Sequence, residues 1–182
     1  MKIIDTKIEG LKIIEPKIYN DYRGYFFEPY NKVNFQNFFG PINFIQDNES
    51  RSLKGVLRGF HFQKPPFEQA KLVRCVYGKI LDVALDLRRK SKTFGHYEKV
   101  ILSDDNKKQF FIPRGFAHAF LVLSNEAVFS YKVDNVYSPE FDSGVIWNDP
   151  DLGVDWGISS SDIIISKKDS QLKSFQDLKS QL

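Results

Sequence analysis

Ala127-Val128-Phe129-Ser130-Tyr131-Lys132-Val133 is the stretch that decides the fold class, because its side chains alternate between two faces. Residues an even number of steps apart share one face of a β-strand. Tyr131 therefore shares a face with Ala127, Phe129 and Val133, while Ser130 and Lys132 point the other way. This alternation predicts a strand with Tyr131 directed into an apolar interior.

Similar short segments, rich in Val, Ile, Phe and Tyr, recur on both sides of this stretch. Turn-forming residues separate them, at 21–24, 54–55, 77–78, 104–106 and 113–115. This spacing predicts an all-β barrel or sandwich. Only 34–39 and the tail 170–182 have a helical pattern, so we expect short peripheral helices. No shift in composition marks a boundary, and we expect one domain over residues 1–182.

The composition limits the classes of protein to which this chain can belong. A chain of 182 residues, 42% hydrophobic and 27% charged, can bury a core as a single domain. The net charge of +3 is spread along the chain, which predicts neither a nucleic-acid partner nor a membrane partner. No apolar run approaches the roughly 18 residues needed to cross a membrane. The single cysteine, Cys75, is expected to be an inert core residue of a cytoplasmic protein.

Several polar residues share a face with apolar ones. The same alternation places five further polar residues on strand faces whose other members are apolar residues or glycine. They are Lys71, Gln46, Asn48, His61 and His118. Lys71 joins Val73 and Cys75, and His61 follows Leu57 and Gly59. A barrel lined in this way would enclose a polar cavity.

The three histidines limit the proton-transfer and metal chemistry that the chain can perform. His96 lies in a polar stretch and is expected to be a solvated turn residue. His61, flanked by Phe60 and Phe62, fits a core histidine and a catalytic base equally well. A metal site is an alternative, with His61, Glu68 and His118 as ligands. The spacing of these residues partly follows the two metal-ligand motifs of cupin barrels, in which a second histidine stands where this chain has Gln63. Glutamine is a poorer ligand than imidazole, so a metal-free barrel is favoured.

Longer motifs run in order from about Ile3 to about Leu172. They are the stretches 21–28, 59–74, 82–88, 113–120, 131–140 and 147–150. In this order and at these spacings they closely resemble the dTDP-4-dehydrorhamnose 3,5-epimerase family. The chain departs from that family's pattern at Glu68, where alanine is common, and at Ala119, where glycine is common.

The resemblance implies a cupin-like β-barrel of the jelly-roll type, a homodimer, and catalysis without a cofactor or metal. It assigns His61 as general base, Asp169 as the carboxylate that orients it, Tyr131 as general acid and Lys71 as the neighbour of the substrate's C4 oxygen. The substrate-binding residues that it implies are Arg23, Glu28, Gln46, Asn48, Arg58, His118, Tyr137 and Lys167.

The chemistry of a 4-keto sugar suits this set. A ketone at C4 acidifies the hydrogens on C3 and C5, so a base can remove either one if a cation stabilises the enolate. Inversion then needs a proton donor on the opposite face of the ring. The resemblance implies epimerisation at C3 and C5 of dTDP-4-keto-6-deoxyglucose to dTDP-4-dehydro-L-rhamnose, in dTDP-rhamnose biosynthesis. The alternatives are a single-centre epimerase on another 4-keto nucleotide sugar, a metal-dependent cupin enzyme, and a non-catalytic sugar-nucleotide binding module.

Overall fold

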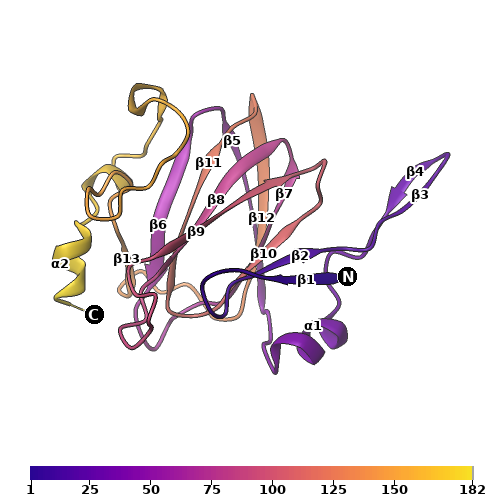
Figure 1. Cartoon of the computed structure of the whole chain (residues 1–182), viewed down its shortest axis with the longest axis horizontal. Coiled ribbons are helices and arrows are strands. Elements are labelled where there is room, and N and C mark those ends of the chain that lie inside the picture. Colours follow the sequence, from indigo (N-terminus) through magenta and orange to yellow (C-terminus); the bar gives the residue numbers. More distant parts are fainter. Residues whose placement is uncertain (182) are drawn as a thin grey trace.

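Two antiparallel sheets pack face to face in the computed structural model, which describes residues 1–181 (Figure 1). The first sheet has the order β1 (Lys2–Asp5), β2 (Lys12–Glu15), β10 (Gln109–Ile112), β7 (Lys71–Tyr77), β12 (Glu126–Val133) and β5 (Gln46–Leu53). The second has the order β13 (Asp142–Gly144), β6 (Leu57–Gln63), β11 (Phe116–Val122), β8 (Lys79–Asp86) and β9 (Tyr97–Ser103). The prediction of an all-β, cupin-like barrel with short peripheral helices is confirmed.

Each turn that the sequence predicts joins two strands. Residues 54–55 connect β5 to β6, 77–78 connect β7 to β8, and 113–115 connect β10 to β11. Residues 21–24 close a separate hairpin of β3 (Tyr19–Asp21) and β4 (Gly24–Phe26), which projects away from the barrel (Figure 1). Glycine suits Gly78, because it has a φ of +81° and a Cβ there would lie within 3.2 Å of the Cα of Ala127.

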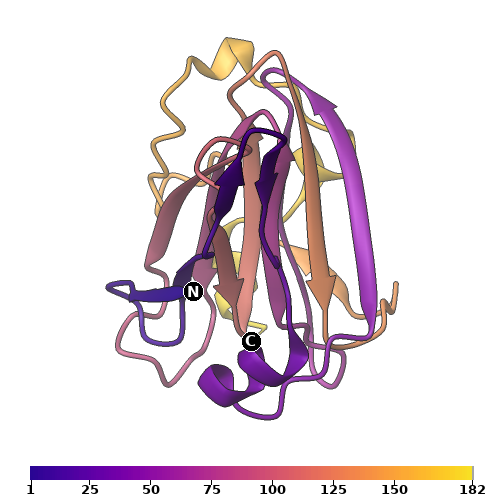
Figure 2. The same ribbon diagram turned by 90° about the vertical axis from the view of Figure 1, so that its right-hand side faces the viewer.

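The predicted helix at 34–39 is present as α1 (Lys32–Phe39), which lies at one end of the strands (Figure 2). Asn31 caps it, since its side chain accepts a hydrogen bond from the N–H of Asn34 at 3.1 Å. Phe35 and Phe39 pack on Phe111 of β10, at ring-centroid distances of 5.4 and 4.7 Å. This helix therefore covers the outer face of the first sheet.

The predicted helical tail over 170–182 is confirmed only in part. The region contains a single turn, η2 (Asp169–Gln171), and one short helix, α2 (Phe175–Lys179), joined by irregular backbone; η1 (Ser160–Asp162) precedes them. Leu182 lies outside the described residues. Phe175 and Leu178 are buried beside Trp156 against the outer face of the second sheet. Tertiary packing thus shapes a segment whose own helical propensity is weak.

The interior between the sheets is filled from both sides by alternate side chains. Val73 and Cys75 of β7 and Phe129 of β12 meet Phe116 and Phe120 of β11 in one buried cluster. Tyr131 packs against the same cluster. The predicted inward faces of β7, β11 and β12 are confirmed. Burial also raises the pKa of the Cys75 thiol to about 12, in agreement with an inert core cysteine.

Strand β6 departs from simple alternation at Gly59. His118 of β11 pairs with His61, but Phe120 pairs with Arg58. Between these two pairs β6 therefore advances by three residues while β11 advances by two. An extra residue of this kind is a β-bulge, and it reverses which side chains share a face. The predicted grouping of His61 with Leu57 fails at this bulge. Leu57 packs in the outer cluster, although it also borders the cavity that Arg58 and His61 line.

Glycine is required at the bulge itself. Gly59 has a φ of +114°, and a Cβ there would lie 2.7 Å from the Cα of Ala119. This glycine therefore allows β6 and β11 to approach closely.

Candidate active site

A cavity of about 620 Å³ opens between the two sheets, next to the C-terminal segment. Strands β5, β6, β7, β11 and β12 supply most of its wall. The residues that line it are Asn48, Glu49, Ser50, Val56, Leu57, Arg58, His61, Lys71, His118, Phe120, Phe129, Tyr131, Ile164, Ile165, Ser166, Lys168 and Asp169. Seven of the twelve residues predicted as site residues are in this set. They come from distant parts of the chain.

His61 and Asp169 form a hydrogen-bonded pair in this cavity. The Nε2 of His61 lies 2.8 Å from Oδ1 of Asp169, while the other carboxylate oxygen accepts the N–H of Gly59 at 3.3 Å. Asp169 is buried, whereas the His61 side chain is 32% exposed. Burial raises the pKa of the Asp169 carboxyl, but the hydrogen bond and charge of His61, together with hydrogen bonds to Gly59 and Ser166, lower the pKa overall. The pair leaves Nδ1 of His61 as the free basic atom.

Lys71 presents an ammonium group to the same cavity. Burial lowers the pKa of Lys71 to about 8, and the negative charges of Asp82 and Asp142 oppose that decrease. The residue is therefore mostly cationic at neutral pH. A cation held in a poorly solvated cavity stabilises a developing oxyanion more strongly than one in bulk water.

Tyr131 lies on β12, opposite Asn48 of β5 and Val73 of β7. Its ring contacts Phe129 at a centroid distance of 5.5 Å. Burial raises the pKa of the phenol, although the positive charge of Arg58 opposes the change. The hydroxyl therefore stays protonated through neutral pH, as a proton donor must.

Arg58 and Asn48 lie on the same side of the cavity, towards β5. The Nε of Arg58 donates to Oγ of buried Ser52 at 3.1 Å. In the described part of the chain this is the one side-chain bond of Arg58, which leaves its two terminal nitrogens available to an anion. Asn48 accepts a hydrogen bond from Gln46 at 2.8 Å.

His118 is buried beneath the cavity and is held by Asp82. Both carboxylate oxygens of Asp82 lie 3.0 Å from Nε2 of His118, and burial lowers the pKa of this histidine against the attraction of Asp82. Asp82 is not among the predicted site residues, although the period of two places its carboxylate on the face of Ile80 and Ala84.

Three other predicted residues lie near the cavity but do not line it. Gln46 is exposed at the start of β5, and the period of two fails there because residues 41–45 are not a strand. Tyr137 is 54% exposed and donates to Asp142 at 3.2 Å. Lys167 is exposed, and its neighbour Lys168 lines the cavity instead. Irregular backbone carries no periodic signal that could have identified Lys168.

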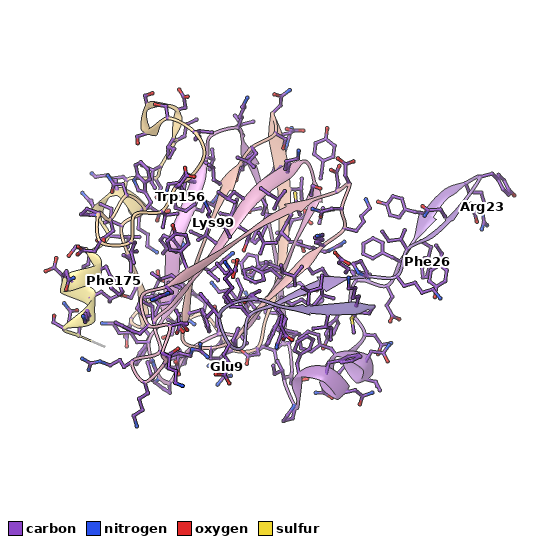
Figure 3. All side chains as sticks on the ribbon, in the orientation of Figure 1. Glu9, Arg23, Phe26, Lys99, Trp156 and Phe175 are labelled. Carbon is purple, nitrogen blue, oxygen red and sulfur yellow. The ribbon has the colours of Figure 1, made fainter. Side chains whose placement is uncertain are left out.

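Arg23 and Glu28 lie away from the cavity. Arg23 is at the tip of the β3–β4 hairpin, far from Trp156 and Phe175 of the C-terminal segment (Figure 3), and pairs with Asp21 at 2.6 Å. Glu28 accepts a bond from Asn31 at 3.2 Å. Within a single chain, the structure does not bring these two residues to the other predicted site residues.

The alternative metal ligands are not assembled. Glu68 lies at a different cavity, beside Gln63 and Arg88, whereas His61 and His118 each bind a carboxylate. Within residues 1–181, no group of three His, Cys, Asp or Glu side chains could hold a metal ion. His96 is exposed after a turn, as expected.

Comparisons with known proteins agree with this geometry. A sequence profile of the family described as dTDP-4-dehydrorhamnose 3,5-epimerase matches residues 5–177. The curated dTDP-4-dehydrorhamnose 3,5-epimerase of Methanothermobacter thermautotrophicus is 50% identical over 177 residues, covering 97% of this chain and 95% of that protein.

Solved structures are similar over nearly the whole chain. The dTDP-4-dehydrorhamnose 3,5-epimerase of Elizabethkingia anophelis NUHP1 has a TM-score of 0.94 and 50% identity, covering 97% of each chain. The dTDP-6-deoxy-D-glucose-3,5-epimerase of Legionella pneumophila Philadelphia 1, solved with dTDP-4-keto-L-rhamnose, has a TM-score of 0.94 and 45% identity. That match covers 99% of this chain and 95% of the Legionella chain.

Proposed function

Because this chain belongs to the dTDP-4-dehydrorhamnose 3,5-epimerase family, we propose that its cavity inverts C3 and C5 of dTDP-4-keto-6-deoxyglucose. As a member of that family the chain is an isomerase, and its product is dTDP-4-dehydro-L-rhamnose. The observation that carries the proposal is the meeting of the His61–Asp169 pair with Lys71 and Tyr131 in one cavity.

In the proposed first step, Nδ1 of His61 removes the hydrogen from a carbon next to the C4 ketone. Asp169 holds Nε2–H, so the imidazole keeps one tautomer and the imidazolium that forms is stabilised. Lys71 lies near the C4 oxygen and stabilises the negative charge of the enolate. No hydride moves in this step, so no redox cofactor takes part.

In the proposed second step, Tyr131 returns a proton to the opposite face of the same carbon. Its protonated phenol is the donor, and the enolate oxygen stays paired with Lys71 until the carbon is protonated. Solvent then takes the proton from His61 and returns one to Tyr131, and the same two steps take place at the other carbon. The two residues act on opposite faces of one ring, which is what inversion requires.

The nucleoside diphosphate is proposed to bind on the Arg58 side of the cavity. A guanidinium with free terminal nitrogens binds phosphate oxygens bidentately. The other residues of this chain that we propose to bind the substrate in this cavity are Asn48, His118, Gln46, Tyr137 and Lys167. Gln46 bonds to Asn48, and Lys167 adjoins the cavity-lining Lys168, which supports a place for both at the mouth.

Arg58→Ala is expected to raise KM by about 10- to 100-fold, because a charged hydrogen bond contributes roughly 1.5–3 kcal/mol and 1.4 kcal/mol is tenfold. The kcat should change little, since the phosphate contact is similar in the ground and transition states. Steady-state kinetics measure both constants. Arg51→Ala is the matched control, because Arg51 pairs with Glu126 outside this cavity. A collapse of kcat at constant KM would contradict the phosphate assignment.

The pH dependence should have an alkaline limb set by Lys71. Burial lowers its pKa to about 8, so the cation is present below that pH and is lost as the pH rises through it. Tyr131 loses its proton only at higher pH, since burial raises its pKa above the ordinary value. The profile of kcat/KM should therefore fall above about pH 8. Lys71→Arg, which keeps the charge, should move this limb upwards; an unchanged limb would assign it to another group.

A homodimer is proposed, in which Arg23 and Glu28 reach the cavity of the partner chain. Tyr19, Tyr22, Tyr25 and Phe26 of the hairpin are all more than half exposed, an apolar surface that a second copy could cover. Symmetric dimers are also the commonest homo-oligomers. Light scattering at micromolar concentration tests this, and a monomer would contradict it.

One domain over residues 1–182 and a cytoplasmic location complete the proposal. A nucleotide-sugar substrate and a single buried cysteine support that location. Among the described residues, neither α1 nor α2 has the length and apolar character of a membrane-crossing helix.

Incorporation of solvent deuterium tests the function directly. The protein is incubated with dTDP-4-keto-6-deoxyglucose in D₂O, and NMR follows deuterium at C3 and C5 together with the configuration of each carbon. Exchange with inversion at both carbons is expected, and exchange at one carbon alone would favour a single-centre epimerase. Binding without exchange would favour a non-catalytic module. Loss of exchange on chelation, restored by one metal, would favour a metal-dependent enzyme.

A further inference from the structure

One motif of the sequence, the stretch 147–150, has no part in the proposed proton transfers. Its carboxylate, Asp149, is 2% exposed. One oxygen of Asp149 accepts the backbone N–H groups of Asp151 and Leu152, at 3.0 and 3.3 Å. The other oxygen accepts the N–H of Phe175, the first residue of α2, at 2.7 Å. The carboxylate therefore joins one loop to a segment that follows 26 residues later in the chain.

The loop that carries Asp149 is anchored on the outer face of the second sheet. Leu152 and Trp156 are buried in the same cluster as Phe60 of β6, and the rings of Trp156 and Phe60 lie 5.8 Å apart. Nε1 of Trp156 also donates to the carbonyl of Trp147 at 3.1 Å. The loop is thus fixed to the strand that carries the proposed general base.

The backbone just before Asp149 lies between β6 and the C-terminal segment. On one side, the N–H and the carbonyl of Val145 bond to the backbone of Phe60, at 3.1 and 3.2 Å. On the other side, the N–H of Ile146 donates to the carbonyl of Lys173 at 2.9 Å. This backbone is therefore a common base for the two segments that bring the catalytic histidine and its carboxylate together.

Asp169 lies six residues before Phe175, in the single turn η2. Its N–H donates to Oγ of Ser166 at 3.0 Å, and its side chain lies 2.8 Å from Nε2 of His61. The backbone between η2 and α2 is irregular, so its position depends on bonds to other parts of the chain. Release of Phe175 removes one of these bonds. A displacement of about 1 Å at Asp169 is enough to break its bond to His61.

We propose that Asp149 is a positioning residue for the proton transfer, which holds the C-terminal segment where Asp169 can bond to Nε2 of His61. A carboxylate suits this position because both of its oxygens accept hydrogen bonds, whereas an amide has one acceptor oxygen and one NH2 group. In Asp149→Asn, at least one backbone N–H therefore loses its acceptor, whichever way the amide is turned. The inference rests on the proposed function for the reaction that reports it, but the bond between Asp149 and Phe175 does not depend on that function.

Double-variant kinetics test whether Asp149 acts through Asp169. Asp149→Asn is expected to lower kcat by about 10- to 100-fold, since a misplacement of about 1 Å can cost about 10²-fold. KM should change by less, because Arg58, Lys71 and Tyr131 are positioned by β6, β7 and β12. Adding Asp149→Asn to Asp169→Asn should cause no further loss, because the bond that Asp149 maintains is already altered. A loss equal to the product of the two separate losses would overturn the inference.

Long-range ¹H–¹⁵N correlation with ¹⁵N-labelled histidine gives a second readout on the free protein. Nε2 of His61 is expected to carry the hydrogen in the unmodified protein, and Asp149→Asn should give a mixture of the two tautomers. Asp177→Asn is the matched control, because this carboxylate accepts a bond from Ser174 at the start of the same helix. It should leave kcat and the His61 signals unchanged. Reduced thermal stability of Asp149→Asn with unchanged His61 signals would overturn the inference, since only a structural role would remain.

Amide hydrogen exchange tests the bond in the unmodified protein, without need of a folded variant. The N–H of Phe175 is expected to be protected, because its acceptor is a buried carboxylate. Exchange of this N–H at the rate of an unbonded amide would overturn the inference. If the unmodified protein neither exchanged nor inverted C3 and C5 of the sugar, the proposed function would be contradicted. The His61 signals and the protection of Phe175 would still decide whether Asp149 positions Asp169.

Discussion

His61→Ala is expected to abolish both epimerisation and the exchange of the C3 and C5 hydrogens with solvent. General base catalysis contributes about 10² to 10⁴ in rate, so a loss of about 10³-fold is expected in kcat. Of the histidines within residues 1–181, only His61 and His118 line the cavity, and burial lowers the pKa of His118, which makes it the weaker base. The measurement is deuterium content at C3 and C5 by NMR, together with turnover.

Two comparisons make this result specific. His96→Ala removes an exposed histidine outside the cavity and should leave both readouts unchanged. Asp169→Asn should slow exchange and inversion together, by a smaller factor, because it spoils the tautomer and basicity of His61 but leaves the imidazole. If His61→Ala exchanged hydrogens at the unmodified rate, the assignment of the base would be wrong.

Tyr131→Phe is expected to separate exchange from inversion. The variant keeps the ring and its packing on Phe129 but deletes the proton donor. His61 can still remove a proton and return deuterium to the same face, so exchange at one or both carbons should persist. Inverted product should fall by about 10²-fold or more, the usual contribution of a general acid.

The readout is the ratio of exchange to inversion, measured in one NMR experiment. Tyr77→Phe removes an exposed hydroxyl elsewhere on the sheet and should leave the ratio unchanged. Normal inversion of both centres by Tyr131→Phe would exclude the phenol as donor. Equal loss of exchange and inversion would mean that Tyr131 supports deprotonation instead.

The sequence predicts the site best where strands are regular. The period of two places Lys71 with Val73, and Tyr131 with Phe129, and both side chains line the cavity. It works there because a side chain's face in a strand depends only on its distance in sequence from its neighbours. The same rule could have identified Asp82, which lies between Ile80 and Ala84 on the inward face of β8.

The period of two fails to predict the face of a side chain where the strand is irregular. One extra residue at Gly59 puts Arg58 and His61 in the same cavity, although they are three residues apart. Gln46 follows coil and is exposed, and Lys168, not Lys167, reaches the cavity from an irregular segment. A bulge or a coil depends on contacts with other strands, such as that of Gly59 with Ala119, and those contacts are not encoded in local spacing.

By itself the sequence determined the all-β class, the turns between strands, the inward faces of β7, β11 and β12, and the family. Those properties follow from local alternation, turn chemistry and the order of motifs. Only the tertiary structure decided which nitrogen of each histidine is free and that Asp82 holds His118. The fold also brings Asp169 to within 2.8 Å of a histidine 108 residues earlier in the chain, a pairing that the family resemblance implied but local spacing did not. These pairings depend on the packing of the C-terminal segment and of neighbouring strands, because distance along the chain says nothing about distance across a sheet.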